Sequence, residues 1–380
     1  MPGLHPAGTL CLAALADGDA GGADVAGQPD GGDQHLRPAQ TLAASAPAGH
    51  GRRMNAGSAA GAPPGAIDRL RHLGRRLRGF HRPDLWLARR IGRVLPDRLY
   101  LAVGHLIYFG RWPDYRQPRS FNEHIQAYML RCRSPLLQLA ADKAAARQWV
   151  IEQVGDTHVL PQLGLWTHAE AVPLRTLARP CVLKPTVGSG RVIFLRENDP
   201  PLDAAVEAAL RLEMQRWLDT DFSRQSREWC YSGLRGRILA EPMLNDPSEP
   251  GGIPPDHKIY VIGGAVRFIQ VDRGRFGRHT RNLYDTDWRL LPVRLTLDNH
   301  APDPRPAELD AMIALALKLA APFEFLRVDL YLCEGRLIVG ELTSYPGAGF
   351  ERFMPSDFAL ELGAHWTRAM RARPDDHQPA

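Results

Sequence analysis

From Asp114 onward, the sequence predicts an α+β fold, and three observations support this prediction. Short apolar stretches typical of strands alternate with longer stretches of helical spacing. Two pairs of these strands are joined by short glycine-containing turns, as in β-hairpins. The chain has 380 residues, 44% of them hydrophobic and 23% charged, which is enough for two or three packed lobes around sizeable cores.

Residues 1–115 differ in composition from the rest of the chain. Residues 1–65 are rich in Ala, Gly, Pro and Asp without apolar periodicity, so we expect disorder, or upstream sequence before a true start at Met54. Residues 66–115 predict a basic helical segment, with ten arginines between Arg69 and Arg98. This segment either packs on the main domain with a solvated face, or associates peripherally with an anionic membrane through residues 67–103. Nucleic-acid binding is not expected, because no recognised motif accompanies the charge.

The elements of the main domain, residues 116–370, follow in order. Leu139–Gly155 reads as a helix, and Pro180–Pro185 as a strand that leads through a glycine loop to a second strand at Val192–Leu195. The remaining predictions are a helix at 204–218, a buried strand at 237–241, a hairpin at 258–271, a helix at 307–321, a second hairpin at 326–342 and a flexible tail at 371–380.

The composition excludes some classes of site and of protein. The five cysteines are scattered without a CxxC pair, which favours reduced thiols in a cytoplasmic protein and argues against a zinc site. No run of eighteen uncharged apolar residues predicts a spanning helix. The net charge is +5, and the positive charge is almost all arginine, since the chain has only four lysines: Lys143, Lys184, Lys258 and Lys318. In such a chain, the lysines are candidates for places where a guanidinium does not fit.

The second hairpin carries the first candidate site. Strand alternation puts Arg327 and Asp329 on one face, and Glu341 and Thr343 share a face of the returning strand. With a turn near Glu334 and Gly335, Asp329 and Glu341 lie roughly opposite each other. Two facing carboxylates repel unless a cation separates them, and oxygen ligands suit Mg²⁺. Taken alone, the pattern also fits a solvated, charged hairpin.

A second candidate site is the loop after Pro180–Pro185. Lys184 ends this strand and is followed by Gly188, Ser189 and Gly190. Glycines let backbone N–H groups approach phosphate oxygens, and the lysine adds a point charge. The lysine precedes the glycines, so the segment is not a Walker A motif, and a Gly/Ser turn by itself is common between strands.

Taken together, these segments resemble the ATP-grasp superfamily, and within it the TupA-like branch, which is linked to teichuronopeptide and other surface-polysaccharide synthesis. The resemblance covers about residues 118–366. It rests on seven motifs in order: Phe121–His124 (FNEH), Asp142–Arg147 (DKAAAR), Val182–Gly190 (VLKPTVGSG), Leu239–Pro242 (LAEP), Asp256–Tyr260 (DHKIY), Arg327–Tyr331 (RVDLY) and Gly340–Thr343 (GELT). It implies two α+β lobes that enclose a nucleotide.

The resemblance also implies roles for individual residues. Lys143 and Lys184 would reach the nucleotide phosphates beneath the loop of Gly188, Ser189 and Gly190; Glu241 to Leu244 would form the hinge against adenine, and Asp256 would contact ribose. Lys258 would reach phosphate or substrate, Arg327 would stabilise the transferring phosphoryl group, and Asp329, Glu341 and Thr343 would ligate Mg²⁺. Two residues depart from the family pattern: Thr343 replaces an expected Asn, and Val187 replaces a polar residue of the glycine loop.

The function that the resemblance implies is an ATP- and Mg²⁺-dependent carboxylate–amine ligase working through an acyl-phosphate. It would act in cell-surface polysaccharide or teichuronopeptide-type biosynthesis, joining a small-molecule or glycan carboxylate to an amine, in the cytoplasm or at the inner face of the membrane. The alternatives are an ATP-grasp kinase with a hydroxyl acceptor and a non-catalytic membrane-docking protein. Four arginines after the first hairpin (Arg273, Arg275, Arg278 and Arg281) either grip an anionic acceptor or form a solvated loop.

Overall fold

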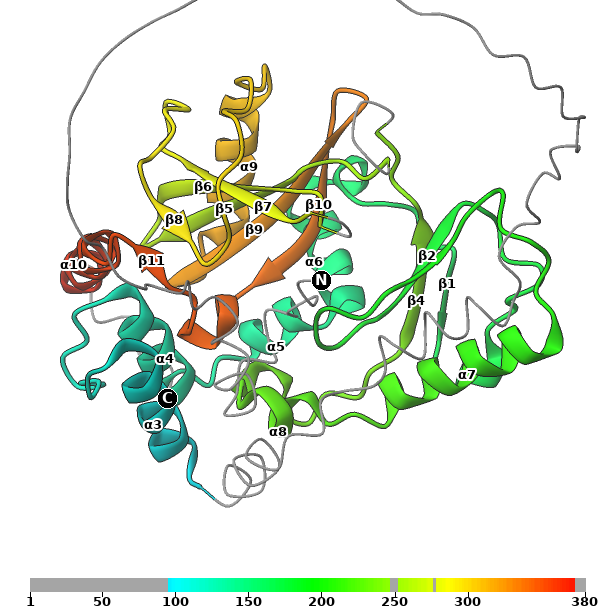
Figure 1. Cartoon of the computed structure of the whole chain (residues 1–380), viewed down its shortest axis with the longest axis horizontal. Helices are drawn as coiled ribbons and strands as arrows, with labels where there is room; N and C mark the ends of the chain where they lie inside the picture. The colour runs from blue at the N-terminus through cyan, green and yellow to red at the C-terminus, as the bar shows by residue number, and fades with distance from the viewer. Residues whose placement is uncertain (1–94, 247–251, 276–277, 373–380) are drawn as a thin grey trace, which may run out of the picture. The chain divides into compact units, whose positions relative to one another are not determined.

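The computed structural model describes residues 95–246, 252–275 and 278–372, and these form an α+β fold built on two main antiparallel sheets (Figure 1). The predicted fold class is therefore confirmed. The predictions for residues 1–65, for most of the basic segment and for the tail beyond 372 lie outside the described residues. Within the described part of the chain, no helix is both long enough and apolar enough to cross a bilayer.

The smaller sheet has four strands in the order β1-β4-β2-β3. Their bounds are β1 Gly164–Trp166, β2 Cys181–Pro185, β3 Ile193–Leu195 and β4 Ile238–Pro242. Helix α7, Ala204–Leu218, contributes Met214 and Trp217 to a core that they share with Leu183 and Ala240 of the sheet. Because all four side chains are nearly inaccessible to water, this lobe has its own hydrophobic core. Strands β2, β3 and β4 and helix α7 confirm the sequence predictions.

The larger sheet has five strands in the order β10-β9-β5-β6-β7. Their bounds are β5 Asp256–Ile262, β6 Ala265–Arg273, β7 Thr280–Tyr284, β9 Phe325–Cys333 and β10 Arg336–Thr343. Both predicted hairpins are present, and Gly263 and Gly264 make the first turn with φ of +57° and +80°, values that only glycine adopts readily. Strand β7 was not predicted, because its sequence, TRNLY, begins with three polar residues and has hydrophobic side chains only at Leu283 and Tyr284.

Helices cover the larger sheet. Helix α9, Leu309–Ala320, confirms the helix predicted at 307–321; it packs against β5, β6 and β9 and leaves Lys318 exposed. Helices α4, Phe121–Arg131, and α10, Asp357–Ala372, lie against each other, and ring contacts join Phe121 to Trp366 and Trp366 to Phe325. Helix α3, Asp97–Phe109, lies within the predicted basic segment.

The remaining elements are short: α8 Phe222–Ser226, η2 Asp156–His158, η3 Ala169–Ala171, η4 Trp229–Tyr231, η5 Pro346–Gly349, and β8 Arg294–Leu295 paired with β11 Phe353–Met354.

One predicted helix is wrong. The stretch Leu139–Gly155 contains two helices, α5, Pro135–Ala141, and α6, Lys143–Val154, separated at Asp142. Asp142 has extended backbone angles, and its carboxylate accepts hydrogen bonds from the backbone N–H groups of Ala144 and Ala145. The break occurs because Asp is a good N-cap, so it starts a new helix rather than continuing the old one. Lys143 is therefore the first residue of α6.

Candidate active site

The centre of the candidate site is a row of charged side chains across three neighbouring strands. Glu341 of β10 is the direct cross-strand partner of Asp329 in β9, and Asp329 is in turn the partner of Lys258 in β5. The facing positions of Asp329 and Glu341 confirm the sequence prediction. A bulge between Val339 and Glu341 interrupts the β9–β10 ladder beside this pair. The row lies on the face opposite the fully buried Val328, and so away from the core beneath the sheet.

Arg327 lies two residues before Asp329, on the same face of β9. Its Nε donates to Asp329 Oδ1 at 2.6 Å, and its Nη2 donates to Oδ2 at 2.7 Å, which makes a bidentate pair. The same Nη2 donates to Thr343 Oγ1 at 3.0 Å. Arg327 therefore fixes the orientation of two of the three predicted metal ligands, Asp329 and Thr343.

Lys258 is buried between two carboxylates. Its ammonium donates to Asp329 Oδ2 at 2.7 Å and also to Asp256 Oδ2, which accepts a further bond from Arg275 Nη1 at 3.1 Å. The other oxygen of Asp256, Oδ1, is buried without a hydrogen-bond partner in the described part of the chain. An unpaired buried carboxylate oxygen is costly, which marks Asp256 as a candidate for contact with a ligand. The structure thus places Asp256 beside the metal-ligand row on the larger sheet, apart from the predicted hinge on β4.

Lys143 connects the glycine loop to the carboxylate row. Its Nζ donates to the carbonyl oxygen of Gly188 at 2.6 Å and lies 3.5 Å from Glu341 Oε1. Burial alone would raise the pKa of Glu341, but attraction from Lys143 and from Arg327, Arg275 and Lys258 lowers it to about 2. Glu341 is therefore fully ionised at neutral pH, as a metal ligand requires.

Lys184 and Glu241 lie on neighbouring strands of the smaller sheet, β2 and β4, and form an ion pair. A small pocket is lined by both of these residues together with Lys143 and Glu341. Leu244 follows β4 and is half-buried. Four residues predicted separately, from both lobes, therefore border one cavity, although the smaller and larger sheets have separate cores.

The glycine loop is held in a conformation that requires glycine. Gly188 and Gly190 have φ of +91° and +75°, and a Cβ at Gly188 would lie 2.5 Å from the Phe222 ring. Val187, whose apolar side chain departs from the family pattern, is buried and makes an isolated β-bridge with Asp142. Ser189 and Gly190 are the more exposed part of the loop. Val187 therefore anchors the loop, which leaves the following residues to contact a ligand.

The sequence predictions missed a hub of hydrogen bonds, formed by Asp142, Thr186 and Arg237, that holds the glycine loop against helix α6. Arg237, just before β4, places Nη2 3.3 and 3.2 Å from the two carboxylate oxygens of Asp142. The backbone N–H of Thr186 donates to the Arg237 carbonyl, and the Thr186 carbonyl accepts from the backbone N–H of Lys143. The Thr186 hydroxyl accepts from the Arg237 backbone N–H at 3.1 Å. The sequence did contain one indication of this arrangement, because Asp142 is a good helix N-cap, but the prediction of one continuous helix overlooked it. Arg147, the last residue of the DKAAAR motif, donates to the Leu160 carbonyl and lines the pocket.

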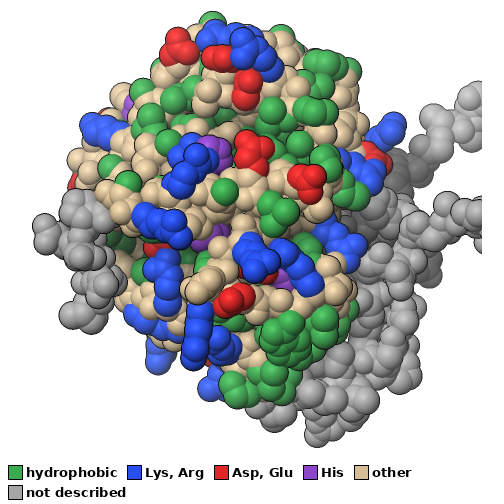
Figure 2. Space-filling view, turned by 90° about the vertical axis from the view of Figure 1, so that its left-hand side faces the viewer, with side chains coloured by type: hydrophobic (Ala, Val, Ile, Leu, Met, Phe, Trp, Pro, Cys, Tyr) green, Lys and Arg blue, Asp and Glu red, His purple; other side chains and the backbone are tan. Residues whose placement is uncertain are grey.

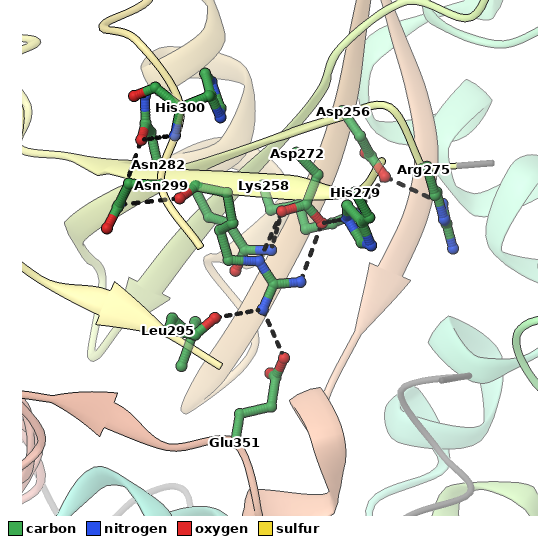
Figure 3. A network of polar contacts seen from close by, with 12 residues as sticks. Asp256, Lys258, Asp272, Arg275, His279, Asn282, Leu295, Asn299, His300 and Glu351 are labelled. Carbon is green, nitrogen blue, oxygen red and sulfur yellow. Dashed lines mark hydrogen bonds and ion pairs between the residues drawn. The ribbon is translucent and has the colours of Figure 1, made fainter. Parts of the chain in front are cut away.

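The four arginines after the first hairpin divide into two groups. Arg281, in β7, is buried and paired with Asp272 and Glu351, two carboxylates that Figure 3 labels. Arg273 is paired with Asp303. Burial raises the pKa of Asp272, but Arg281 outweighs it and holds that pKa well below its usual range. Arg275 is bonded to Asp256 but remains partly exposed, and Arg278 is exposed. Arg273 and Arg281 thus stabilise the fold. Of the four arginines considered for binding an anionic acceptor, Arg275 and Arg278 remain candidates.

The comparison with protein families decides the classification. The family described as TupA-like ATPgrasp matches residues 123–367, which is more than half of the chain. The chain belongs to the TupA-like ATP-grasp family. The sequence resemblance, and with it the predicted fold, is therefore confirmed. No curated protein gives a significant match.

Solved structures give distant likenesses to this TupA-like ATP-grasp chain. One is the ATP-grasp ligase PsnB complexed with a minimal precursor, with 15% identity, coverage of 56% of this chain and 54% of that one, and a TM-score of 0.32. Another is D-alanine–D-alanine ligase from Bacillus anthracis complexed with ATP, with 14% identity, 62% and 66% coverage and a TM-score of 0.36. The chain spans about half to two thirds of the length of these two proteins.

The residues of this TupA-like ATP-grasp site suit Mg²⁺ by their chemistry. Asp329, Glu341 and Thr343 offer only oxygen donors, which Mg²⁺ prefers. No group of three His, Cys, Asp or Glu side chains within the described ranges is arranged as a metal cluster, and Thr343 would supply the third donor here. Glu341 is ionised and paired with Lys143, and Asp329, whose pKa burial raises, is paired with Arg327 and Lys258, so a bound Mg²⁺ would share or replace those contacts.

Proposed function

We propose that the chain is an ATP- and Mg²⁺-dependent ligase that joins a carboxylate to an amine. One observation carries the proposal: the Asp329–Glu341 pair is bordered by Lys143, Lys258 and Arg327, and a pocket joins Glu341 to Lys184 on the smaller lobe. ATP carries several negative charges, and phosphoryl transfer is catalysed mainly by positioning and by cations. Membership of the TupA-like ATP-grasp family supports the same activity.

The reaction has two steps. A carboxylate oxygen of the first substrate attacks the γ-phosphorus of ATP, the bond from that phosphorus to the bridging oxygen breaks, and ADP leaves. An amine then attacks the acyl-phosphate carbon, phosphate leaves with its oxygen, and the amine loses a proton as the amide forms. Lys143 and Lys184 would hold the phosphates, and Arg327 and Lys258 would offset charge on the transferring group. Asp329, Glu341 and Thr343 would hold Mg²⁺, which supplies further charge neutralisation.

We further propose that the carboxylate belongs to a cell-surface polysaccharide precursor or to a peptide attached to one. The family's link to teichuronopeptide synthesis supports this substrate class. Arg275 and Arg278 also support it, since neither is buried and Arg275 lies next to the Asp256–Lys258 pair, where an anionic acceptor would come close to the γ-phosphate. Uronic acids and acidic peptides are the acceptors to screen first, with amino acids as amine donors.

The test is trapping of the acyl-phosphate. The protein is incubated with MgATP, a panel of carboxylates and hydroxylamine, which converts an acyl-phosphate to a stable hydroxamate. We expect hydroxamate and ADP in equal amounts with the correct carboxylate. ADP release with a phosphorylated alcohol and no hydroxamate would identify a kinase instead. A wild-type melting temperature that does not respond to MgATP would contradict both enzymatic functions.

A further inference from the structure

Helix α3 has two apolar faces. One face packs into the protein through Tyr100, Leu101 and His105. The other carries Leu99, Val103, Leu106 and Ile107, which recur at i, i+4, i+7 and i+8 and so form one stripe along the helix. In this stripe, Leu99, Leu106 and Ile107 are 41%, 40% and 51% exposed. A surface helix normally places polar residues on its outer face, so this stripe, which the described residues leave exposed, is a candidate contact surface.

The exposed apolar surface continues past the helix. Trp112, just beyond the C-cap Gly110, is 57% exposed, the highest value among the exposed large hydrophobic residues of the described ranges. A shallow cavity lined by Pro96, Leu99, Trp112 and Tyr115 connects Trp112 to the start of the stripe. Figure 2 shows hydrophobic side chains gathered at the lower right of one face, with Lys and Arg side chains beside and above them. The stripe and Trp112 are called the α3 surface below.

Positive charge is concentrated in the part of the sequence that includes this surface. Residues 66–119 contain thirteen arginines and four aspartates, a net charge of +9, whereas the rest of the chain sums to −4, and the described residues 95–119 contain four arginines and two aspartates. Arg98, Arg111 and Arg116 are exposed on α3 and on the segment that follows it. The local carboxylates are engaged: Asp97 is paired with Arg227, and Asp114 accepts two backbone N–H groups.

We propose that the α3 surface docks on an anionic lipid bilayer, with the apolar stripe and Trp112 entering the headgroup region and the arginines binding lipid phosphates. Combined apolar and basic surfaces are what peripheral membrane binding requires. Tryptophan favours the interfacial region because its ring is amphipathic. A soluble polyanion would use the arginines but leave the apolar stripe exposed to water, so the stripe favours a membrane. This inference is independent of the proposed ligase activity.

The experiment uses the full chain and vesicle flotation. Vesicles of phosphatidylcholine alone are compared with vesicles of phosphatidylcholine mixed with phosphatidylglycerol, each at low and high salt. The test variant is Leu106→Ser/Ile107→Ser, and the matched control is Leu212→Ser/Leu290→Ser, which removes two equally exposed leucines elsewhere. Thermal melting of both variants establishes that they remain folded.

We expect the wild type to float with the anionic vesicles only and to dissociate at high salt. The test variant should bind these vesicles at least about tenfold more weakly, since it loses two inserted apolar side chains, and the control variant should match the wild type. Equal binding of the test variant and the wild type would show that the arginines alone bind anions, and would overturn the proposal. Failure of the folded wild type to bind either kind of vesicle would also overturn it.

Discussion

Arg237 and Asp142 form an ion pair that joins the residue before β4 to the N-cap of α6, with Arg237 Nη2 3.2 Å from Asp142 Oδ2. The same aspartate caps the helix whose first residue is Lys143. Because Lys143 bonds the Gly188 carbonyl, the ion pair determines where the glycine loop lies relative to Glu341. Arg237 is thus a positioning residue, although it touches none of the predicted ligands of the nucleotide.

The first prediction concerns Arg237→Gln. A partly exposed ion pair contributes about 1 kcal/mol, so we expect KM for ATP to rise about fivefold. The value of kcat should change less, because Arg327 and Lys258 are untouched. Arg237→Lys should recover part of the loss, and Arg235→Gln, at an exposed position two residues earlier, should behave as wild type. The measurement is steady-state kinetics with ATP as the varied substrate. A fall in kcat with an unchanged KM for ATP would contradict a positioning role for Arg237.

The second prediction is that replacing lysine by arginine is not conservative in the site. Lys258 is buried between Asp256 and Asp329, where a planar guanidinium is too large and cannot keep both contacts. We expect Lys258→Arg to lower kcat/KM for ATP about a hundredfold. Lys318→Arg, on the exposed side of α9, is the control and should have no effect. Wild-type kinetics in Lys258→Arg would mean that a generic positive charge suffices there.

The third prediction separates the two carboxylates. Glu341→Gln replaces a partly exposed carboxylate that is a predicted metal ligand, so we expect the protein to remain folded. Its kcat should fall roughly a thousandfold, and the Mg²⁺ concentration needed for half-maximal activity should rise. Asp329→Asn also leaves Arg327 and Lys258 buried without their shared partner, which should cost about 3–5 kcal/mol of unfolding free energy. Glu334→Gln, at the exposed hairpin turn, is the control. Activity titrated against Mg²⁺, together with urea unfolding, distinguishes a metal ligand from a purely structural carboxylate.

Part of the site could be predicted from the sequence because it lies on hairpins, where alternation along β9 and β10 indicates which side chains share a face. The register set by the turn would place Gly340 opposite Asp329, and the bulge between Val339 and Glu341, which was not predicted from the sequence, brings Glu341 to that position. The hub around Asp142 could not be predicted in the same way. Its partner Arg237 is 95 residues away, and only the tertiary fold brings it near. Likewise, nothing local distinguishes Arg281, buried with Asp272, from the exposed Arg278.

The last prediction is a pH dependence of stability centred on His124 of α4. Its imidazole stacks on Trp366 and contacts Thr367 Oγ1 at 3.1 Å, and burial, assisted by the charge of Arg131, lowers its pKa to about 4. An unfolded histidine titrates near pH 6.5, so between these values the unfolded chain binds more protons than the folded one. His124 therefore costs no stability above about pH 6.5, and unfolding free energy falls as the pH drops toward 4, by up to about 3 kcal/mol.

The measurement is urea unfolding at pH 7.5 and pH 5. His124→Gln should be less stable than wild type at the higher pH, because it loses the ring stacking, yet it should lose less stability on acidification. His168→Gln, at an exposed position, is the control and should keep the wild-type slope. If His124→Gln loses as much stability as wild type between the two pH values, the acid sensitivity belongs to other buried histidines, of which His105 and His257 also have lowered pKa values, mainly through burial.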